Sequence, residues 1–474
     1  MNKTLDSHPC TPPVGRILHL GLGSFHRAHQ AVYLQRLKCQ KEPHWLLAGT
    51  NIRSDMNPLL ENLSAQQGHY TLETVDPDGN TSYEWITAID QVIPWEPDLA
   101  TATRLAADPL TKIISFTVTE AGYYLLPSGE LDTGFVDLSA DLTRVAQGTT
   151  GQTIYGALMG MLRARMQAGA GPITLLCCDN LRHNGDRFKS GLRDFARRLE
   201  ANDLLQWIDD NTRSPNCMVD RITPRPPAAL KERVQQATGR HDAVPVTAES
   251  YIQWVIEDNF ANGRPPWELA GAQMVSSVDP YEEAKIRILN ATHSCIAWAG
   301  TLRGYRYIHE GTRDQTIRNM AYDYVTDDVI PCLDGPNNPV DLPAYRDLVL
   351  ERFGNVAICD TNQRVAMDGF SKIPGFIAPT IRERLARQES IAAVAVLPAL
   401  FFIFLTRWHE GKIPYDYQDQ GMDPASCHAM MQATDPLAAF CADLTLWSDL
   451  ASNPTLVDAM RQAVARVKNE FIKP

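Results

Sequence analysis

The sequence predicts a doubly wound α/β domain at the N-terminus and a mostly α-helical domain at the C-terminus. Two observations predict this. In the first part of the chain, short apolar runs alternate with helical patterns; after about residue 276, long helical segments dominate. A length of 474 residues fits two or three domains of ordinary size. We therefore expect one domain over residues 1–276 and a second over residues 277–474.

Four apolar runs bounded by turn or polar residues are typical of buried parallel strands. They cover residues 16–20, 45–49, 112–118 and 173–178. Helical patterns alternate with them, for example at residues 28–37 and 153–167, which indicates right-handed strand–helix–strand crossovers. A hairpin is expected within residues 70–89, where Asp78-Gly79 marks the turn.

The second domain is predicted from long helical patterns. They cover residues 281–310, 316–330, 343–352, 380–387, 391–408 and 454–471, and Pro280 suits the first turn of the first helix. Residues 391–405 carry no charge, but fifteen residues are fewer than the roughly 20 that cross a bilayer, and Pro398 interrupts them. A buried helix that begins after Ser390 as N-cap is therefore expected instead of a membrane span.

Composition and charge exclude several classes of protein. Hydrophobic residues make up 44% and charged residues 21%, as in folded globular proteins. The net charge of −12 disfavours nucleic acid as a partner. Ten scattered cysteines without paired ligand spacing, and a start without an apolar signal core, indicate a cytoplasmic protein with reduced thiols and no metal site. We expect a monomer or small homo-oligomer that acts on a small molecule.

A glycine-containing loop follows the first predicted strand and opens a helix. Gly21 allows a tight turn, and Gly23 lets the backbone approach a pyrophosphate at the helix N-terminus. His26 stands where the third glycine of a G-x-G-x-x-G pattern would be, so a purely structural turn remains an alternative. At the end of the second strand, Asp55 would suit the ribose of NAD and Arg53 the 2′-phosphate of NADP, and both cofactors stay open.

Four polar side chains share one face of the predicted helix at residues 281–310. At 100° per residue, Glu282, Lys285, Asn290 and His293 fall within a sector of about 140° on an otherwise apolar helix. A desolvated lysine has a lowered pKa and can act as a base, and an asparagine amide can stabilise an alkoxide. His293 could donate to a neighbouring hydroxyl and Glu282 could relay protons. A solvated helix face with ion pairs is the alternative.

Two further segments carry candidate residues. Asn180 follows the strand at residues 173–178, and ligands bind at the carboxyl ends of parallel strands, so it could supply a second amide. Residues 360–372 place two cations, Arg364 and Lys372, in the second domain, where plain surface charge is the alternative.

These motifs together resemble the polyol-specific long-chain dehydrogenases, the mannitol dehydrogenase family, over nearly the whole chain. The resemblance is carried by residues 21–29, 117–123, 178–185 and 218–224, and by Lys285 with asparagine at +5 and histidine at +8. It implies a Rossmann-like N-terminal domain, a mostly helical C-terminal domain and a site between them. It also implies NAD-dependent oxidation of a secondary alcohol of a sugar alcohol to a ketose, without a metal.

The resemblance also implies roles for individual residues. Lys285 would be the general base, Asn180 and Asn290 the oxyanion-binding amides, His293 a substrate hydrogen bonder and Glu282 a gate for proton exit. Asp220, Arg364 and Lys372 would contact substrate hydroxyls. Gly21, Gly23, Ser24, Phe25, Asn51, Arg53 and Glu120 would bind the cofactor.

Three segments favour one substrate within this family. Residues 21–26, 324–331 and 370–376 look most similar to enzymes that convert D-arabinitol to D-xylulose. Oxidation of mannitol, reduction of a ketouronate such as fructuronate or tagaturonate, and a non-catalytic dinucleotide sensor are the alternatives. NAD is the expected cofactor, and NADP is not excluded.

Overall fold

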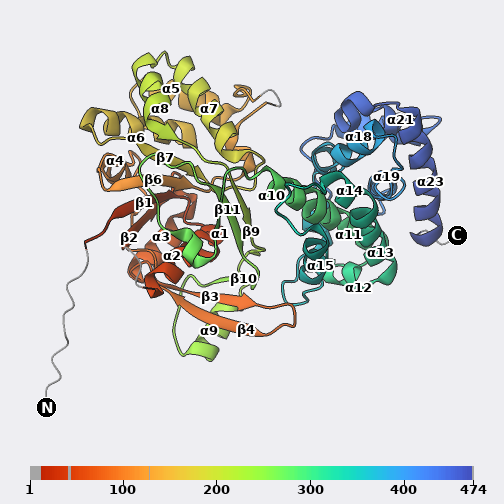
Figure 1. Ribbon diagram of the computed structural model, residues 1–474, viewed down its shortest axis with the longest axis horizontal. Coiled ribbons are helices and arrows are strands. Elements are labelled where there is room, and N and C mark those ends of the chain that lie inside the picture. Colours follow the sequence, from red (N-terminus) through yellow and green to blue (C-terminus); the bar gives the residue numbers. More distant parts are fainter. Residues whose placement is uncertain (1–11, 41–43, 127–128, 472–474) are drawn as a thin grey trace. The chain divides into compact units, whose positions relative to one another are not determined.

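The computed structural model describes residues 12–40, 44–126 and 129–471 (Figure 1). The chain divides into two compact units. The first unit consists of Met1–Asp76 and Thr81–Val278, and the second of Pro77–Asn80 and Asp279–Pro474. The first is an α/β unit and the second is helical, so the predicted fold class is confirmed.

A parallel sheet of six strands forms the centre of the described part of the first unit. Across the sheet the strands are β5 (Gln91–Val92), β2 (Trp45–Thr50), β1 (Gly15–Leu20), β6 (Thr111–Phe116), β7 (Ile173–Cys177) and β8 (Thr212–Arg213). Numbered by their order in the chain, they run 3-2-1-4-5-6, the doubly wound order of Rossmann-like sheets. The order reverses between β1 and β6, where such sheets bind their ligands. All four predicted strands are present.

Side chains from alternate positions of the central strands enter two separate cores. Leu18, Ile114 and Leu175 pack on one face, against helices that include α4 (Ala100–Ala106), α6 (Ile154–Ala168), α7 (Asn184–Arg198) and α8 (Asn202–Asn211). Their chain neighbours Ile17 and Ile113 pack on the other face, against α2 (Gln30–Cys39) and α3 (Asn57–Ala65). Successive strand residues point to opposite faces, so apolar runs without alternation produce a sheet that is buried on both sides.

Two small sheets complete the first unit and were not predicted as sheets. The predicted hairpin is confirmed: β3 (Tyr70–Val75) and β4 (Thr81–Ile86) are antiparallel, and β10 (Val246–Glu249) pairs with β3. In the second small sheet, β11 (Gln253–Glu257) lies between β9 (Cys217–Asp220) and β12 (Gln273–Val275).

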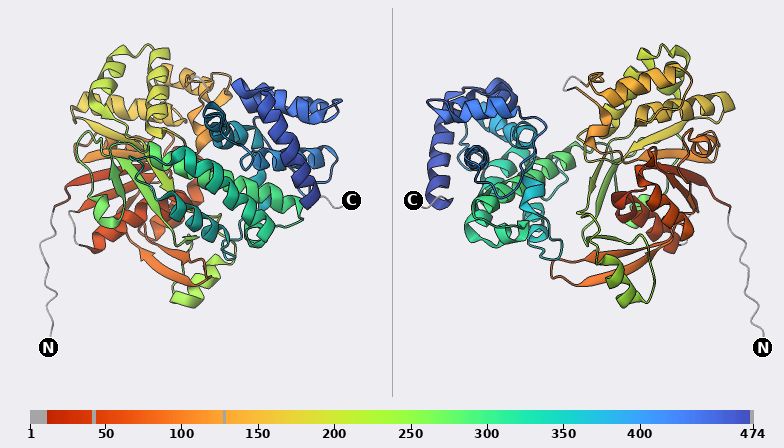
Figure 2. Two further views of the ribbon diagram at one scale, coloured as in Figure 1. Left: turned by 45° about the vertical axis from the view of Figure 1, so that its right-hand side comes forward. Right: turned by 180° about the vertical axis from the view of Figure 1, so that it is seen from behind.

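The second unit consists of helices joined by loops in both views of Figure 2. The longer helices are α11 (Ala291–Leu302), α13 (Gln315–Asp323), α15 (Leu342–Phe353), α18 (Ala378–Ala386), α19 (Val396–His409) and α23 (Pro454–Phe471). Shorter ones include α10 (Asp279–Ala284), α12 (Ile308–Arg313), α14 (Ile330–Leu333), α16 (Asn362–Ala366) and α17 (Gly369–Lys372). Three π-helical segments, Lys285–Asn290, Tyr324–Val329 and Ile373–Ile377, continue α10, α13 and α17.

Two predicted helix boundaries were wrong. The helix expected over residues 281–310 ends at Leu302, because Gly304 adopts the left-handed region with φ +79° and the chain turns before α12 begins. The helix expected after Ser390 begins at Val396, since Pro398 has no backbone N–H and is tolerated only in the first turn. The Ser390 hydroxyl instead accepts a hydrogen bond from the Ala392 amide.

The apolar helix α19 is part of the core, with Val396 to Leu405 all buried. Across the part of the chain that the structure describes, no helix has both the length and the apolar character needed to cross a membrane.

Candidate functional site

The loop after β1 crosses the tip of β6 at the reversal point of the sheet. The Gly21 amide donates to the Thr50 carbonyl at 2.8 Å, and Gly21 has φ +115°. A Cβ atom at Gly21 would lie 2.4 Å from the Thr117 carbonyl oxygen, so no other residue fits this turn without a shift of the backbone. The tight turn predicted at Gly21 is therefore present in the structure.

Gly23 shows the properties that an anion-binding loop requires. It precedes α1 (Ser24–Ala28), and no side chain caps the start of this helix. A Cβ atom at Gly23 would meet nothing closer than the Gly21 carbonyl at 4.0 Å, so the space beside it is open. An uncapped helix start and open space beside the backbone fit the pyrophosphate of a dinucleotide. Ser24 lies in this first turn, and the Phe25 ring stacks on His29 at 5.0 Å.

Four candidate cofactor-binding residues lie after β2 or after β6, and two of them, Asn51 and Arg53, have protein partners. The buried Asn51 side chain accepts a hydrogen bond from the Leu22 amide at 2.8 Å and so braces the loop. The Arg53 guanidinium donates to the Tyr124 hydroxyl at 2.8 Å and to the Asp137 carboxylate at 3.2 Å. Asp55 is exposed in the short turn Ser54–Met56. Glu120 begins the turn Glu120–Tyr123, and its side chain lies outside the described part of the structure.

Two histidines lie next to the loop of residues 21–23, which is called the nucleotide loop from here on. The rings of His19 and His26 stack with centroids 3.5 Å apart, and both are buried. Burial lowers the pKa of His19 to about 3, against the opposing effect of the Gly21 carbonyl, and lowers the pKa of His26 well below its usual value. Both rings are therefore neutral. His26, which replaces the third glycine of the G-x-G-x-x-G pattern, is accommodated because its ring packs on His19.

Two adjacent residues after β7, Asp179 and Asn180, have different surroundings. The Asp179 carboxylate accepts hydrogen bonds from the amides of Val118 and Thr119 and from the Tyr123 hydroxyl at 2.6 Å. Asn180, the next residue, is exposed and follows the carboxyl end of β7. Asp220 ends β9 and is buried, with 5% exposure.

In the second unit, the helix that carries the predicted catalytic residues contains a π-helical segment. It begins at Lys285 and ends at Asn290. The sector expected from 100° per residue is wrong here, because in a π-helix hydrogen bonds join residues i and i+5. Lys285 and Asn290 would lie about 140° apart on an α-helix, but the π-helical turn brings them to the same side.

Lys285 is almost fully buried, with 7% exposure, and Asn290 is half-buried. The flanking helical turns extend this side of the helix, since Glu282 is three residues before Lys285 and His293 three residues after Asn290. An amine, an amide, an imidazole and a carboxylate thus form one continuous strip. Isolated π-helical turns occur frequently at functional sites.

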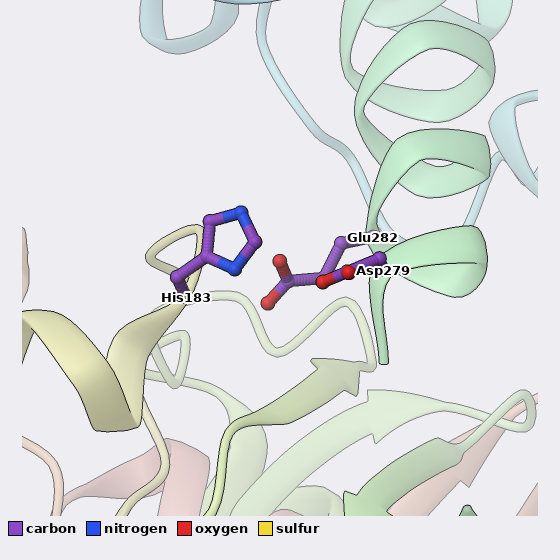
Figure 3. A group of neighbouring side chains, drawn as sticks. All are labelled: His183, Asp279 and Glu282. Atoms are coloured by element: carbon purple, nitrogen blue, oxygen red, sulfur yellow. The ribbon is translucent and has the colours of Figure 1, made fainter. Parts of the chain in front are cut away.

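Two carboxylates lie in the first turn of α10. Figure 3 labels Asp279 and Glu282 there. Glu282 is 4% exposed, and an acidic residue at this position also interacts favourably with the helix dipole.

His293, Asp360 and Arg364 form a group within the second unit. His293 Nε2 lies 3.3 Å from Asp360 Oδ2, in a contact too bent for a regular hydrogen bond. Arg364 binds both oxygens of Asp360, at 2.7 and 2.5 Å. Burial would raise the pKa of Asp360, but His293 and Arg364 together hold it below its usual range. Burial lowers the pKa of His293, and Asp360 opposes this effect.

Two more contacts define the surroundings of this group. The His293 ring stacks on Phe353 with centroids 4.2 Å apart. Lys372 Nζ donates to the Val365 carbonyl at 2.5 Å. Asp360 and Phe353 were missed as site residues; the spacing of four residues between Asp360 and Arg364 was the available signal for an ion pair.

Two family models match the chain. The "Mannitol dehydrogenase Rossmann domain" matches residues 15–269, and the "Mannitol dehydrogenase C-terminal domain" matches residues 277–468. A D-arabinitol 4-dehydrogenase of Ralstonia nicotianae is 57% identical, over 95% of this chain and 96% of the relative. A D-arabinitol 4-dehydrogenase of Klebsiella pneumoniae is 52% identical, over 95% and 97%.

A solved structure shows the same fold. It is the mannitol 2-dehydrogenase of Pseudomonas fluorescens in a ternary complex with NAD and D-mannitol. It is 32% identical, with a TM-score of 0.83 over 97% of this chain and 93% of the other. The family resemblance inferred from the motifs is confirmed.

Proposed function

The chain belongs to the mannitol dehydrogenase family, and we propose that it is an NAD-dependent polyol dehydrogenase that oxidises D-arabinitol to D-xylulose. The observation that carries the reaction type is the π-helical turn that puts the buried Lys285 and Asn290 on one side of a helix. The substrate rests on two relatives with 57% and 52% identity, both named for D-arabinitol.

NAD as the cofactor is supported by the nucleotide loop. Gly21 and Gly23 fit a pyrophosphate, and the related ternary complex contains NAD. When bound, NAD supplies the nicotinamide carbon that accepts the hydride. The Arg53 guanidinium faces Asp137, which offsets the positive charge that a 2′-phosphate would need, so NAD is preferred over NADP.

We assign the proton transfer to the second unit. Neutral Lys285 takes the proton from the substrate hydroxyl, since a buried amine is held uncharged more readily than an exposed one. The amides of Asn290 and Asn180 stabilise the developing oxyanion without adding a titrating charge. Glu282 passes the proton toward solvent, and the reaction needs no metal.

The charge around His293 favours a neutral polyol over a uronate. A carboxylate substrate requires a cation whose charge is not already offset, and Arg364 is bound by both oxygens of Asp360. Arg364, Lys372 and Asp220 therefore serve hydroxyl groups in this proposal. Reduction of a ketouronate would need Arg364 to leave Asp360, or Lys372 to bind the substrate carboxylate.

One assay separates the candidate functions. The purified full-length protein is incubated with NAD or NADP and a panel of D-arabinitol, D-mannitol and D-sorbitol, and with NADH and fructuronate or tagaturonate, while NADH absorbance is followed. We expect the highest kcat/KM with NAD and D-arabinitol, with D-xylulose as product. Preference for mannitol or for a ketouronate would overturn the substrate, and NADH binding without turnover on any of them would indicate a sensor.

A further inference from the structure

A small cavity lies behind the nucleotide loop, inside the first unit. Its lining includes His26 and Gln30 from α1 and α2, Ser115 from β6, and Trp254 and Trp267 from β11 and the turn Trp267–Ala270. The space open to the centre of a water-sized sphere is about 10 Å³, the size needed for a single water molecule. An organic ligand does not fit this volume.

Four of the side chains that line this cavity carry buried polar atoms without a hydrogen-bond partner. They are both ring nitrogens of His26, Gln30 Oε1, and the indole nitrogens of Trp254 and Trp267. All four side chains are more than nine-tenths buried. Buried polar groups without any partner are costly, and a bound water normally satisfies such groups.

The neighbouring hydrogen bonds fix the orientation of Gln30. His29 Nε2 lies 2.9 Å from the Gln253 carbonyl, so this nitrogen carries the proton and Nδ1 is an acceptor. The Gln30 amide lies 3.0 Å from His29 Nδ1 and must present its NH₂ group there. Its carbonyl oxygen is the remaining atom, and it is an acceptor only.

We propose that this cavity binds one structural water molecule that ties the nucleotide loop to β11 and the turn at Trp267. A water molecule accepts two hydrogen bonds and donates two. The two indole N–H groups supply the donors, and Gln30 Oε1 and the unprotonated nitrogen of neutral His26 supply the acceptors. The match of two donors and two acceptors gives the water its full complement of four bonds.

A crystal structure of the full-length protein, at a resolution that reveals ordered waters, tests this proposal. We expect one enclosed water within roughly 2.7–3.2 Å of at least three of the four side chains. Gln30→Leu should lose this water, and its dissociation constant for NADH should rise severalfold. Trp267→Phe provides a second variant should Gln30→Leu not fold. A dry cavity, or an unchanged water in a variant, overturns the proposal.

An independent observation concerns the orientation of His293, and this second inference rests on the proposed function. Asp360 faces His293 Nε2, while Arg364 fixes both carboxylate oxygens and Phe353 fixes the plane of the ring. Asp360 accepts only, so the contact favours the tautomer that carries its proton on Nε2. Nδ1 then has a lone pair.

We infer that Asp360 is a positioning residue that makes His293 accept, and not donate, the hydrogen bond from a substrate hydroxyl. The charged neighbours of the ring are Asp360, Arg364 and Lys372. A bent contact suffices for this role because the carboxylate selects the tautomer by its charge, and Phe353 limits rotation of the ring. The expectation that His293 donates to the substrate is thereby replaced.

Asp360→Asn tests this role, and Asp449→Asn is the matched control because Arg382 holds Asp449 in an exposed pair. Nitrogen NMR of histidine-labelled protein, with His293→Gln for assignment, should show an Nε2–H tautomer that becomes mixed in Asp360→Asn only. The kcat/KM for D-arabinitol should fall roughly 10- to 100-fold. An Asp360→Asn variant that keeps the Nε2–H tautomer would overturn the inference. A wild-type protein that has this tautomer, loses it in Asp360→Asn and turns over no polyol would contradict the proposed function alone.

Discussion

Arg53 lies at the end of β2, where the adenosine ribose of a dinucleotide would bind, and its guanidinium contacts Asp137 at 3.2 Å. Both side chains are about half exposed or more, at 47% and 63%, so the pair is worth at most about 1 kcal/mol. Even a weak ion pair keeps the Asp137 carboxylate beside Arg53, the residue predicted from the sequence to suit the 2′-phosphate of NADP. In the proposed function, the pair therefore bears on the choice between NAD and NADP more than on stability.

Asp137→Asn should therefore improve the use of NADP. Removal of the carboxylate leaves Arg53 for the 2′-phosphate, and we expect kcat/KM with NADP to rise about two- to fivefold, in line with a surface pair. Steady-state kinetics with both cofactors measures this. Asp203→Asn, which breaks an exposed pair with Arg163, is the control and should change neither cofactor. An unchanged NADP/NAD ratio in Asp137→Asn would show that Arg53 does not face the cofactor.

At the scale of elements, the two loop glycines have different requirements. Gly21 needs its positive φ and has no room for a Cβ atom, whereas Gly23 has φ −71° and open space. Gly21→Ala should cost at least about 1–3 kcal/mol of folding stability. Gly23→Ala should leave the thermal midpoint unchanged and still weaken NADH binding, because the added methyl occupies the space of the pyrophosphate. Thermal unfolding with fluorescence titration measures both; tight NADH binding by Gly23→Ala would exclude the pyrophosphate from this loop.

The π-helical turn is the element that brings Lys285 and Asn290 to one side of the helix. Insertion of one alanine after Ile286 should rotate Asn290 by about 100° relative to Lys285 and take it off that side. We expect kcat to fall by at least roughly 10²-fold with the helical content of the protein preserved. The same insertion after Asp327, in the π-helical segment Tyr324–Val329, is the matched control. Activity that survives the first insertion as well as the second would show that Lys285 and Asn290 need not share one side.

These elements also show what a sequence can predict. The central strands, the hairpin and most long helices follow from apolar periodicity, because residues such as Ile17 and Leu18 must face opposite cores. The π-helical turn has no such signal, since its pattern of apolar residues resembles that of an α-helix. Contacts between residues that are distant in the chain could not be predicted either. No residue near Arg53 in the sequence indicates its ion pair with Asp137, and no sequence pattern indicates that the His293 ring stacks on Phe353.

At the scale of the whole molecule, buried neutral histidines predict how stability depends on pH. Burial lowers the pKa of His19 to about 3 from 6.5, so the unfolded chain binds a proton between these values and the folded chain does not. The stabilisation is complete above pH 6.5 and is lost as the pH falls toward 3, at up to about 1.4 kcal/mol per pH unit. His26 and His293, whose pKa values burial also lowers, act in the same direction.

Chemical denaturation at pH 7.5, 6.5 and 5.5 measures this dependence. The free energy of unfolding should decrease across the series, and His19→Gln, which cannot take up a proton, should show a shallower decrease. A free energy that is flat, or that rises on acidification, would mean that these histidines are not buried in the neutral form.

The central claim is that a buried, uncharged Lys285 removes the hydroxyl proton of the polyol. Turnover of D-arabinitol by Lys285→Met, set beside an NADH titration of the same protein, tests it most directly. Lys412→Met, at an exposed lysine paired with Glu410, is the matched control. The account predicts that Lys285→Met lowers kcat roughly 10²–10⁴-fold while NADH binding and the control stay at wild-type values. Wild-type turnover by Lys285→Met at neutral pH would contradict it.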